Sequence, residues 1–592
     1  MPLRSEPIAT HGAVMLDSET ARFALWAPDA HSVEVCLEPD VRHALERGAD
    51  GWFSARLPAI AGRRYRYCID GDLQVADPAS RFQPEGVHGP SQLVDLANYP
   101  WQHSHWNGRP WPEAVIYEVH VGLMGGYAQL IQQLPRLADL GVTAIELMPL
   151  GQFPGERNWG YDGVLPFAPQ HSYGTPEQLC HLIDQAHGHG LMVLVDVIYN
   201  HFGPDGNYLN RYASGFFRQD KHTPWGAAID FRSPQVCDFF IENALMWLHV
   251  YRVDGLRLDA VHAIGHPEYL RELSQRVRQS LAPERQVWLV LENEHNQAHL
   301  LEQAYDGQWN DDGHNALHVL LTGEHEAYYA DYRQATIQKL ARCLSQGFVF
   351  QGEADRTGRP RGEPSAHLPP CAFVLFLQNH DQVGNRALGE RLTRLCPPQA
   401  LRAATTLLLL SPMIPLLFMG EEWGSETPFL FFTDHHDELA DAVREGRRAE
   451  FAGFTAYADP LQRAAIPDPN ALATYSASRP LVPDTPQQPW QAFYRQLLHL
   501  RHQHIVPHLS GCHAEGAEVI GDKALSARWR LADGRTLRID LNLSAAPVPC
   551  MLPQVSTHVY ACTSEPLPSD QLPPFATLVS LLPSPSPEPV HD

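Results

Sequence analysis

Short apolar segments alternate with amphipathic ones between residues 115 and 419, and this alternation limits the possible folds more than any other feature. Each apolar segment has the length of a buried strand, and the segments between them show helical spacing, as at Leu179, Leu182 and Ile183. Buried strands separated by helices are typical of a parallel sheet covered on its outside. The apolar segments lie at 115–119, 142–148, 192–198, 253–259, 287–292, 304–309, 372–378 and 414–419. Eight such segments predict an α/β fold with a closed (β/α)8 TIM barrel.

A doubly wound open sheet is the competing fold. Such a sheet needs a Gly-rich turn after its first strand, and the sequence has no G-x-G-x-x-G motif after a predicted strand. The helix expected around residues 130–137 contains Pro135, which predicts a kink or a late start of that helix. The barrel therefore remains the prediction.

The regions that flank the barrel have a different pattern. A chain of 592 residues is too long for one hydrophobic core. Residues 1–95 contain short alternating runs separated by turn residues, which predicts a β-sandwich. We assign 96–112 to a linker, 113–509 to the barrel domain, and 510–592 to a small β domain with a disordered tail from Pro583. Inside the barrel domain we expect an irregular excursion at 424–490 and a closing helix at 490–509.

Charge and cysteine content argue against several classes of function. The formal net charge of −24 argues against nucleic acid or an anionic membrane as partner. No apolar run reaches the roughly 18 residues of a membrane-spanning helix, and the first residues contain no apolar signal core, so we expect a cytoplasmic protein. The 10 cysteines are scattered without a C-x-x-C pair, so we expect reduced thiols, no zinc site and no cofactor. We expect a monomer or a homodimer.

Polar side chains cluster where the predicted strands end, which is where a barrel carries its active site. Arg257 and Asp259 are two positions apart, so they project from the same face of their strand. An arginine beside a carboxylate keeps that carboxylate ionised. Three other strands end in Asp196–His201, Glu292 and Gln378–Asp381. Burying so many charges for stability alone is costly, so we predict that they form one active site.

The types of residue at these strand ends suggest a reaction. The sequence shows no metal-ligand cluster, cofactor loop or Ser/His pairing, whereas paired carboxylates are the groups that cleave glycosidic bonds. One acid, held ionised by Arg257, would attack the anomeric carbon, and a second, kept protonated in a less polar setting, would protonate the leaving oxygen. A barrel that only binds glycan is the non-enzymatic alternative. The presence of three acids at the strand ends, Asp259, Glu292 and Asp381, argues against it.

Four motifs resemble those of the α-amylase superfamily, in the same order. They are Asp196-x-x-x-Asn200-His201, Gly255-x-Arg257-x-Asp259, Glu292, and Asn379-His380-Asp381. Members of this superfamily have a (β/α)8 barrel and a retaining mechanism. The resemblance implies that Asp259 is the nucleophile, Glu292 the general acid/base and Asp381 the stabiliser of the transition state. It also implies that Arg257, His201 and His380 contact the sugar at the cleavage point, with Tyr161 stacking beneath it.

Further segments resemble the malto-oligosyltrehalose trehalohydrolase family. They lie at 158–164, 169–174, 258–264, 309–312, 378–386 and 418–423, and at 77–81 and 89–91 in the carbohydrate-binding-like sandwich. The resemblance implies hydrolysis of the α-1,4 bond next to the terminal trehalose unit of maltooligosyl trehalose, with release of trehalose and maltodextrin. The alternative is a glycogen-branching or debranching enzyme, which would share the sandwich and the three acids. Segments 259–264 and 378–382 favour the trehalohydrolase.

Four other side chains are candidate substrate contacts. Trp225 could stack on the trehalose side, although ordinary loop packing is an equal alternative. His262 follows the predicted nucleophile by three residues, so it is predicted to line the leaving-group side, with a purely structural role as the alternative. Asp162 is expected to shape the site beside Tyr161, and Asn379 is expected to contact substrate.

Three ambiguities remain in the motifs. Glu294 has the same strand parity as Glu292, but we prefer Glu292 because it directly follows the apolar strand. Asp196 and Asn200 could suggest a calcium site, but no cluster of oxygen ligands accompanies them, so we predict no metal. The segment Glu421–Trp423 is expected to support the barrel mouth through hydrogen bonds.

Overall fold

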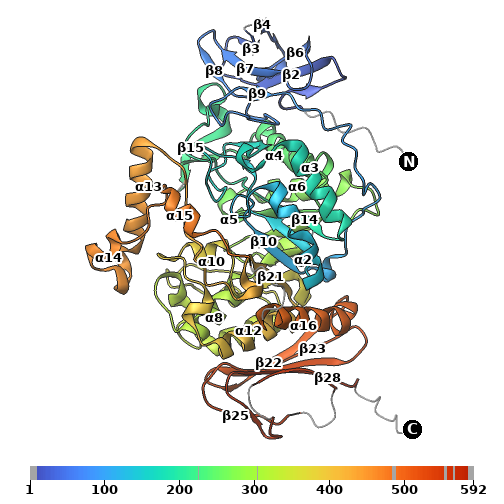
Figure 1. Cartoon of the computed structure of the whole chain (residues 1–592), viewed down its shortest axis with the longest axis vertical. Helices are drawn as coiled ribbons and strands as arrows, with labels where there is room; N and C mark the ends of the chain where they lie inside the picture. Colours follow the sequence, from blue (N-terminus) through green and yellow to red (C-terminus); the bar gives the residue numbers. More distant parts are fainter. Residues whose placement is uncertain are drawn as a thin grey trace.

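A closed barrel of eight parallel strands forms the centre of the molecule (Figure 1). The computed structural model describes residues 10–39, 41–223, 226–302, 304–482, 489–552, 557–563 and 567–584. In order around the barrel, the strands are β10 (Ile116–Val119), β11 (Ala144–Leu147), β14 (Met192–Val197), β17 (Gly255–Leu258), β18 (Trp288–Leu291), β19 (Gly307–Trp309), β20 (Phe373–Phe376) and β21 (Ile414–Phe418). Each of the eight predicted segments supplies one strand, and β21 pairs with β10 to close the ring. The predicted barrel is confirmed.

Helices cover the outside of the barrel. They include α3 (Pro176–Gly188), α4 (Pro234–His249), α6 (Pro267–Ser280), α8 (Asp311–Thr322), α9 (Thr336–Gln346), α12 (Pro398–Leu410) and α16 (Pro489–His504). Helix α3 begins at a capping box in which Thr175 and Gln178 satisfy each other's backbone N–H groups. The predicted interruption near Pro135 is also confirmed, because α1 (Tyr127–Ile131) ends before α2 (Leu134–Leu140) begins.

Two sheets form the N-terminal sandwich, as predicted, at one end of the molecule (Figure 1). The first contains β1 (Val14–Met15), β2 (Thr20–Trp26), β6 (Trp52–Pro58) and β5 (Glu46–Arg47). The second contains β4 (Val41–Ala44), β3 (Val33–Leu37), β7 (Arg64–Ile69) and β8 (Leu73–Val75), with β9 (Ser91–Gln92) paired to β7. In β3 the buried residues are Val33, Val35 and Leu37, which is the alternation expected of a strand with one face in a core.

A five-stranded antiparallel sheet lies at the opposite end of the molecule, beyond α16 (Figure 1). Its strands are β22 (His513–Gly521), β23 (Ala524–Arg530), β24 (Thr536–Asn542), β28 (Ala576–Leu582) and β26 (Thr557–Cys562). A short pair, β25 (Val548–Pro549) and β27 (Gln571–Leu572), accompanies it. Most of the tail that we predicted to be disordered, residues 585–592, lies outside the described residues.

Buried hydrogen bonds attach α16 and the loop after β21 to the barrel. The guanidinium of Arg501, on α16, is buried and donates to the carbonyl oxygens of Leu409, Ser411 and Met413, which lead into β21. After β21, the Glu422 carboxylate accepts hydrogen bonds from the Tyr117 hydroxyl of β10 and from Arg136 of α2. The supporting hydrogen bonds predicted for segment 421–423 are therefore present.

The excursion after β21 contains regular helices, so the prediction of an irregular segment was wrong. Helices α13 (Asp437–Glu450), α14 (Pro460–Ala464) and α15 (Leu472–Ala477) form an arm, residues 437–477, that projects from the barrel (Figure 1). Helix α13 has few apolar residues, and acids in its first turn and arginines in its last turn complement the helix dipole. Arg444 pairs with Asp441 and Arg448 with Glu445, one turn apart.

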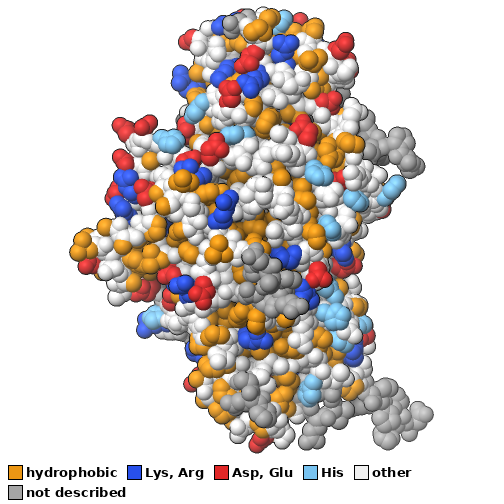
Figure 2. Space-filling view, viewed as in Figure 1, with side chains coloured by type: hydrophobic (Ala, Val, Ile, Leu, Met, Phe, Trp, Pro, Cys, Tyr) orange, Lys and Arg blue, Asp and Glu red, His pale blue; other side chains and the backbone are white. Residues whose placement is uncertain are grey.

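Several hydrogen bonds join the arm to the barrel domain, including one from the Tyr475 hydroxyl to the carbonyl oxygen of Gly122 and two from the buried Arg447. Arg447 donates to the carbonyl oxygens of Gly384 and Arg386. Figure 2 shows acidic and basic side chains interspersed on the face in view, and hydrophobic side chains at the projecting arm. Leu461, on α14, is 78% exposed. None of the described helices is both long enough and apolar enough to cross a bilayer.

Candidate active site

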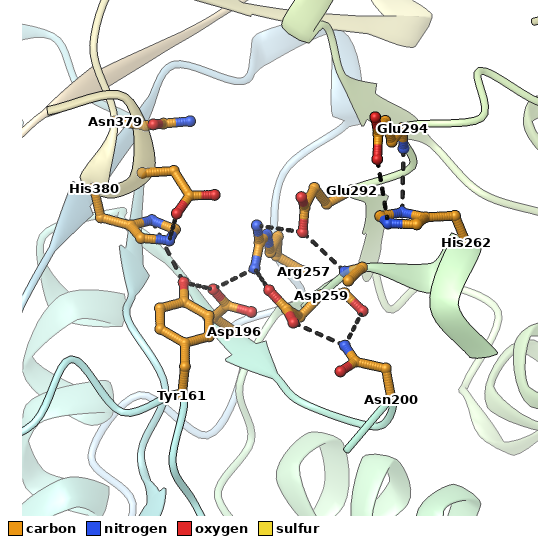
Figure 3. A network of polar contacts seen from close by, with 12 residues as sticks. Tyr161, Asp196, Asn200, Arg257, Asp259, His262, Glu292, Glu294, Asn379 and His380 are labelled. Carbon is orange, nitrogen blue, oxygen red and sulfur yellow. Dashed lines mark hydrogen bonds and ion pairs between the residues drawn. The ribbon is translucent and has the colours of Figure 1, made fainter. Parts of the chain in front are cut away.

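Arg257 is the centre of the polar network at the carboxyl ends of the strands (Figure 3). Its guanidinium is fully buried. Its Nη1 lies 2.7 Å from Asp196 Oδ2 and 2.8 Å from Asp259 Oδ1, and its Nη2 lies 3.0 Å from Glu292 Oε2. The guanidinium also lies over the Trp309 ring, 4.2 Å from its centre. One arginine therefore holds three of the acids that are far apart in the sequence.

The barrel register explains why these groups meet. Asp196 of β14 and Arg257 of β17 are direct neighbours in the parallel ladder, and their side chains lie on the same face. Asp259 and Glu292 each follow the last residue of their strand, β17 and β18. Ala260 adopts a left-handed backbone conformation, with φ of +40°. In this conformation its N–H donates to Glu292 Oε2 at 2.8 Å, so local backbone strain coincides with an active-site contact.

The surroundings drive the pKa values of Asp259 and Glu292 apart. Burial opposes ionisation of Asp259, but the charges of Arg257 and His201 and a hydrogen bond from Asn200 lower its pKa below the usual value. Burial raises the pKa of Glu292 well above its usual value, and the nearby charges of Asp259 and Asp381 raise it further. Glu292 Oε2 accepts two hydrogen bonds, so Oε1 is the oxygen available to carry a proton. One ionised and one protonated carboxyl is the arrangement that glycosidic cleavage requires.

The third predicted acid, Asp381, lies on α10 (His380–Gly384), the helix that follows β20. The Asp381 side chain is 38% exposed, compared with 11% for Asp259 and 17% for Glu292. Its Oδ1 accepts a hydrogen bond from Asn385 and lies 3.6 Å from His380 Nε2. Asn379 is the N-cap of this helix, since its Oδ1 accepts the N–H of Gln382 at 2.8 Å. The carboxylate of Asp381 therefore faces the more open side of the site.

Tyr161 and Asp162 take part in different contacts. The Tyr161 hydroxyl donates to Asp196 Oδ2 at 2.6 Å, and its ring stacks on the His380 ring with centres 4.8 Å apart. Asp162 accepts a hydrogen bond from Asn158 and lies 3.4 Å from His435 Nε2. Burial opposes it, but these two partners lower the pKa of Asp162. Tyr161 therefore belongs to the Arg257 network, whereas Asp162 ties its own loop to the segment after β21.

The two other predicted histidines, His201 and His262, both lie near Asp259. His201 Nε2 lies 2.9 Å from the carbonyl oxygen of Tyr161, and its Nδ1 contacts Asn200 Oδ1. Burial lowers the pKa of His201. His262, in α5 (Val261–Ile264), accepts the Glu294 N–H at its Nδ1 and lies 3.7 Å from the Glu294 carboxylate. Of the two candidate glutamates, only Glu292 contacts Arg257, whereas the Glu294 side chain is 67% exposed (Figure 3).

Two further candidates from the sequence were Trp225 as a sugar contact and Asp196 as a possible calcium ligand. Trp225 lies outside the described residues. Asp196, considered as a calcium ligand, is bonded through Oδ2 to Arg257 and Tyr161. Among the described residues, no group of three or more His, Cys, Asp or Glu side chains is placed to hold a metal ion.

Three acidic residues near the site were not among the candidates predicted from the sequence. Glu118 of β10 accepts hydrogen bonds from His380, and Glu146 lies beside it on β11. Both interrupt apolar strands, and an acid inside an otherwise apolar strand is a signal that could have identified them. Asp311, the first residue of α8, lies near Glu292 and Asp381, and burial raises its pKa to about 7.

Three protein-family models match the chain, one in the N-terminal sandwich, one in the barrel domain and one in the C-terminal sheet. Residues 10–80 match carbohydrate-binding module 48, the isoamylase N-terminal domain. Residues 99–225 match the alpha amylase catalytic domain, and residues 512–579 match a domain of unknown function, DUF3459.

Characterised relatives cover most of the chain. Malto-oligosyltrehalose trehalohydrolase from Deinococcus radiodurans is 41% identical over 470 residues, which is 77% of this chain and 76% of the relative. The protein of the same name from Arthrobacter ramosus is 38% identical over 89% of this chain and 93% of its own length. A glycogen-branching enzyme from Pseudoalteromonas atlantica is 32% identical, but over only 43% of this chain.

A crystal structure shows a closely similar fold. A Salmonella typhimurium protein described as an alpha amylase superimposes with a TM-score of 0.91 at 41% sequence identity, covering 97% of this chain and all of that chain. The similarity therefore includes the sandwich, the barrel and the C-terminal sheet together.

Proposed function

Because this chain belongs to the malto-oligosyltrehalose trehalohydrolase family, a family of glycoside hydrolases, we propose that it cleaves maltooligosyl trehalose. The bond broken is the α-1,4-glucosidic bond next to the terminal trehalose unit, and the products are trehalose and maltodextrin. One observation carries the chemistry: a single buried guanidinium holds Asp259 and Glu292, whose pKa values are shifted in opposite directions.

The proposed reaction has two steps and retains configuration. In the first step, the Asp259 carboxylate attacks the anomeric carbon while Glu292 gives its proton to the leaving oxygen. A covalent glycosyl–enzyme intermediate forms, and Glu292, now ionised, takes a proton from the water that hydrolyses it. Attachment of both carboxyls to one guanidinium is compatible with the spacing of about 5 Å between them that retaining enzymes use.

The remaining groups would position the sugar. Asp381, the most exposed of the three acids, would accept hydrogen bonds from sugar hydroxyls as positive charge develops on the ring. The Tyr161 ring, held by its hydroxyl on Asp196, offers a flat apolar surface to the same sugar. His380 and Asn379 enter the site from α10. His262 lies beside Asp259, which supports a role on the leaving-group side.

Branching or debranching activity is the alternative, because related enzymes use the same kind of barrel. The relatives that cover most of the chain favour the trehalohydrolase. We further propose a role in trehalose formation in the cytoplasm. The 10 cysteines form no disulfide, which supports a reducing compartment.

Product analysis separates these activities. The purified protein is incubated with maltotriosyl trehalose and, separately, with amylose, and the products are resolved by chromatography. Trehalose and maltotriose in equal amounts from the first substrate would support the proposal. New α-1,6 linkages in amylose, or no release of trehalose, would contradict it.

A further inference from the structure

A buried carboxylate of β10 holds the residue that precedes Asp381. Glu118 is 1% exposed. Its Oε2 accepts the backbone N–H of His380 at 2.8 Å, and its Oε1 accepts a hydrogen bond from His380 Nδ1 at 2.5 Å. The His380 side chain is itself 2% exposed. One carboxylate therefore fixes both the backbone and the ring of the first residue of α10.

This contact determines what the other ring nitrogen can do. Because Nδ1–H is committed to Glu118, Nε2 is the nitrogen that faces Asp381, at 3.6 Å. A doubly protonated ring would donate from Nε2, whereas a neutral ring would only accept there. The charge of His380 thus decides whether its Nε2 can donate a hydrogen bond beside Asp381.

The groups around His380 favour the charged ring. Those that face it are Glu118 from β10, Asp381 from α10, Asp196 from β14, Arg257 from β17, Tyr161 from the loop before β13 (Leu165–Pro169), and His120 from the loop after β10. Burial and Arg257 act against protonation, but the charges of Glu118 and Asp381 outweigh them and raise the pKa of His380. Glu118 contributes most because it alone makes a direct hydrogen bond to the ring at 2.5 Å.

A second buried glutamate provides a natural comparison. Glu146 of β11 pairs directly with Glu118 in the barrel register and is also 1% exposed. Neither of its carboxyl oxygens has a hydrogen-bond partner among the described residues. Burial, together with the charge of Glu118, raises its pKa well above the usual value, so Glu146 carries a proton. Two adjacent buried glutamates therefore differ in their hydrogen bonds.

We propose that Glu118 is a positioning residue for the glycosidase reaction, which holds His380 as an imidazolium with its Nε2–H directed toward the substrate. The charged donor then binds a hydroxyl of the sugar that Asp381 also contacts. This inference rests on the proposed function only in requiring that a sugar occupies the site beside Asp259.

The test compares two isosteric variants, Glu118→Gln and Glu146→Gln, in the full-length protein. In Glu118→Gln the new amide carbonyl oxygen can still accept Nδ1–H, but the negative charge is gone, so the ring of His380 loses its second proton at lower pH. We expect kcat/KM of Glu118→Gln to fall about 10- to 100-fold at pH 8, the size expected for one charge-assisted hydrogen bond. The loss in kcat/KM should be smaller at pH 5.5 than at pH 8, because a lower pH favours the second proton on the ring when Glu118 no longer does. Glu146→Gln should retain the wild-type rate and pH profile.

A third variant guards against a folding defect. Glu118→Asp keeps the negative charge but places it farther from the His380 ring. The pH at which its kcat/KM falls on the alkaline side should therefore lie between the values for the wild type and for Glu118→Gln. Thermal unfolding of each variant shows whether it is folded, and Glu118→Asp alone provides the test if Glu118→Gln does not fold. A deficit that is equal at pH 5.5 and pH 8, or an equal effect of Glu146→Gln, would overturn the proposal.

The substrate for these assays is one that the wild type hydrolyses, either maltotriosyl trehalose or an aryl maltooligoside. Failure of the wild type to release trehalose would count against the proposed function only. The comparison of the glutamate variants would still decide the role of Glu118 on the aryl substrate.

Discussion

Replacing Arg257 with lysine tests whether the shared guanidinium organises the site. Lysine keeps the positive charge, but a single ammonium cannot span the fork that now holds Asp196, Asp259 and Glu292. We expect two of the three charge-assisted hydrogen bonds to be lost. Each contributes about 1.5–3 kcal/mol, so transition-state stabilisation should fall by about 3–6 kcal/mol, or about 10²- to 10⁴-fold in kcat/KM.

The assay measures initial rates of trehalose release from maltotriosyl trehalose at limiting substrate, with thermal unfolding recorded for the same samples. The matched control is Arg495→Lys, because the ion pair that Arg495 makes in the described part of the chain is with Asp139, whose side chain is 70% exposed. Such an exposed pair contributes little, so the control should behave as the wild type. A folded Arg257→Lys variant with a rate within about threefold of the wild type would refute this account, since two buried bonds of this strength cannot be lost without effect.

Three further predictions follow from the same contacts. Asp259→Asn should reduce turnover by about 10³-fold or more while calorimetry still detects substrate binding; a rate near that of the wild type would rule out Asp259 as the nucleophile. Because Glu292 must be protonated and burial raises its pKa, kcat should fall as pH rises through that pKa, and Glu292→Gln should abolish this alkaline limb on an aryl substrate that needs no protonation. An unchanged limb would assign it to another group. Asp254→Asn should destabilise the fold by about 3–5 kcal/mol, because the buried carboxylate binds Val193, His187, Trp106 and Arg285. Its pKa is lowered, so this stability is present at neutral pH and lost as pH falls below about 4. Urea unfolding measures the difference, with Asp238→Asn as the control, since the Asp238 side chain is partly exposed and pairs with Arg276; equal midpoints would contradict the prediction.

The barrel could be predicted because its strands are mostly apolar. Parallel strands inside a ring of helices have no polar face, so each appears in the sequence as a continuous apolar run. The shortest strand, β19, has three residues and lies within the predicted segment 304–309, which completed the count of eight. Residues directly after such runs must meet at one end of the barrel, which is why Asp259 and Glu292 could be assigned to one site before any coordinates.

Partners across the barrel could not be predicted in the same way. Glu118 and His380 are 262 positions apart, and only closure of the ring brings them together. Asp162 is next to Tyr161 in the sequence, yet its partner His435 comes from the segment after β21. Helix α13 was missed because its contacts with the barrel are few and its stability depends on charge pairs along its surface. Helix α13 contains few apolar residues, so the apolar side chains that marked the other helices are scarce there.

Arg447 donates to the carbonyl oxygens of Gly384 and Arg386, so the C-terminal end of α10 is held in part by a residue that comes after β21 in the chain. β21 is the last barrel strand in the sequence, so all eight strands are synthesised before Arg447. Asp381 lies on α10, and Arg447, which donates a hydrogen bond to the last residue of this helix, is synthesised about sixty residues later. During synthesis we therefore expect the barrel strands to be complete before the end of α10 that lies near Asp381 is fixed by Arg447.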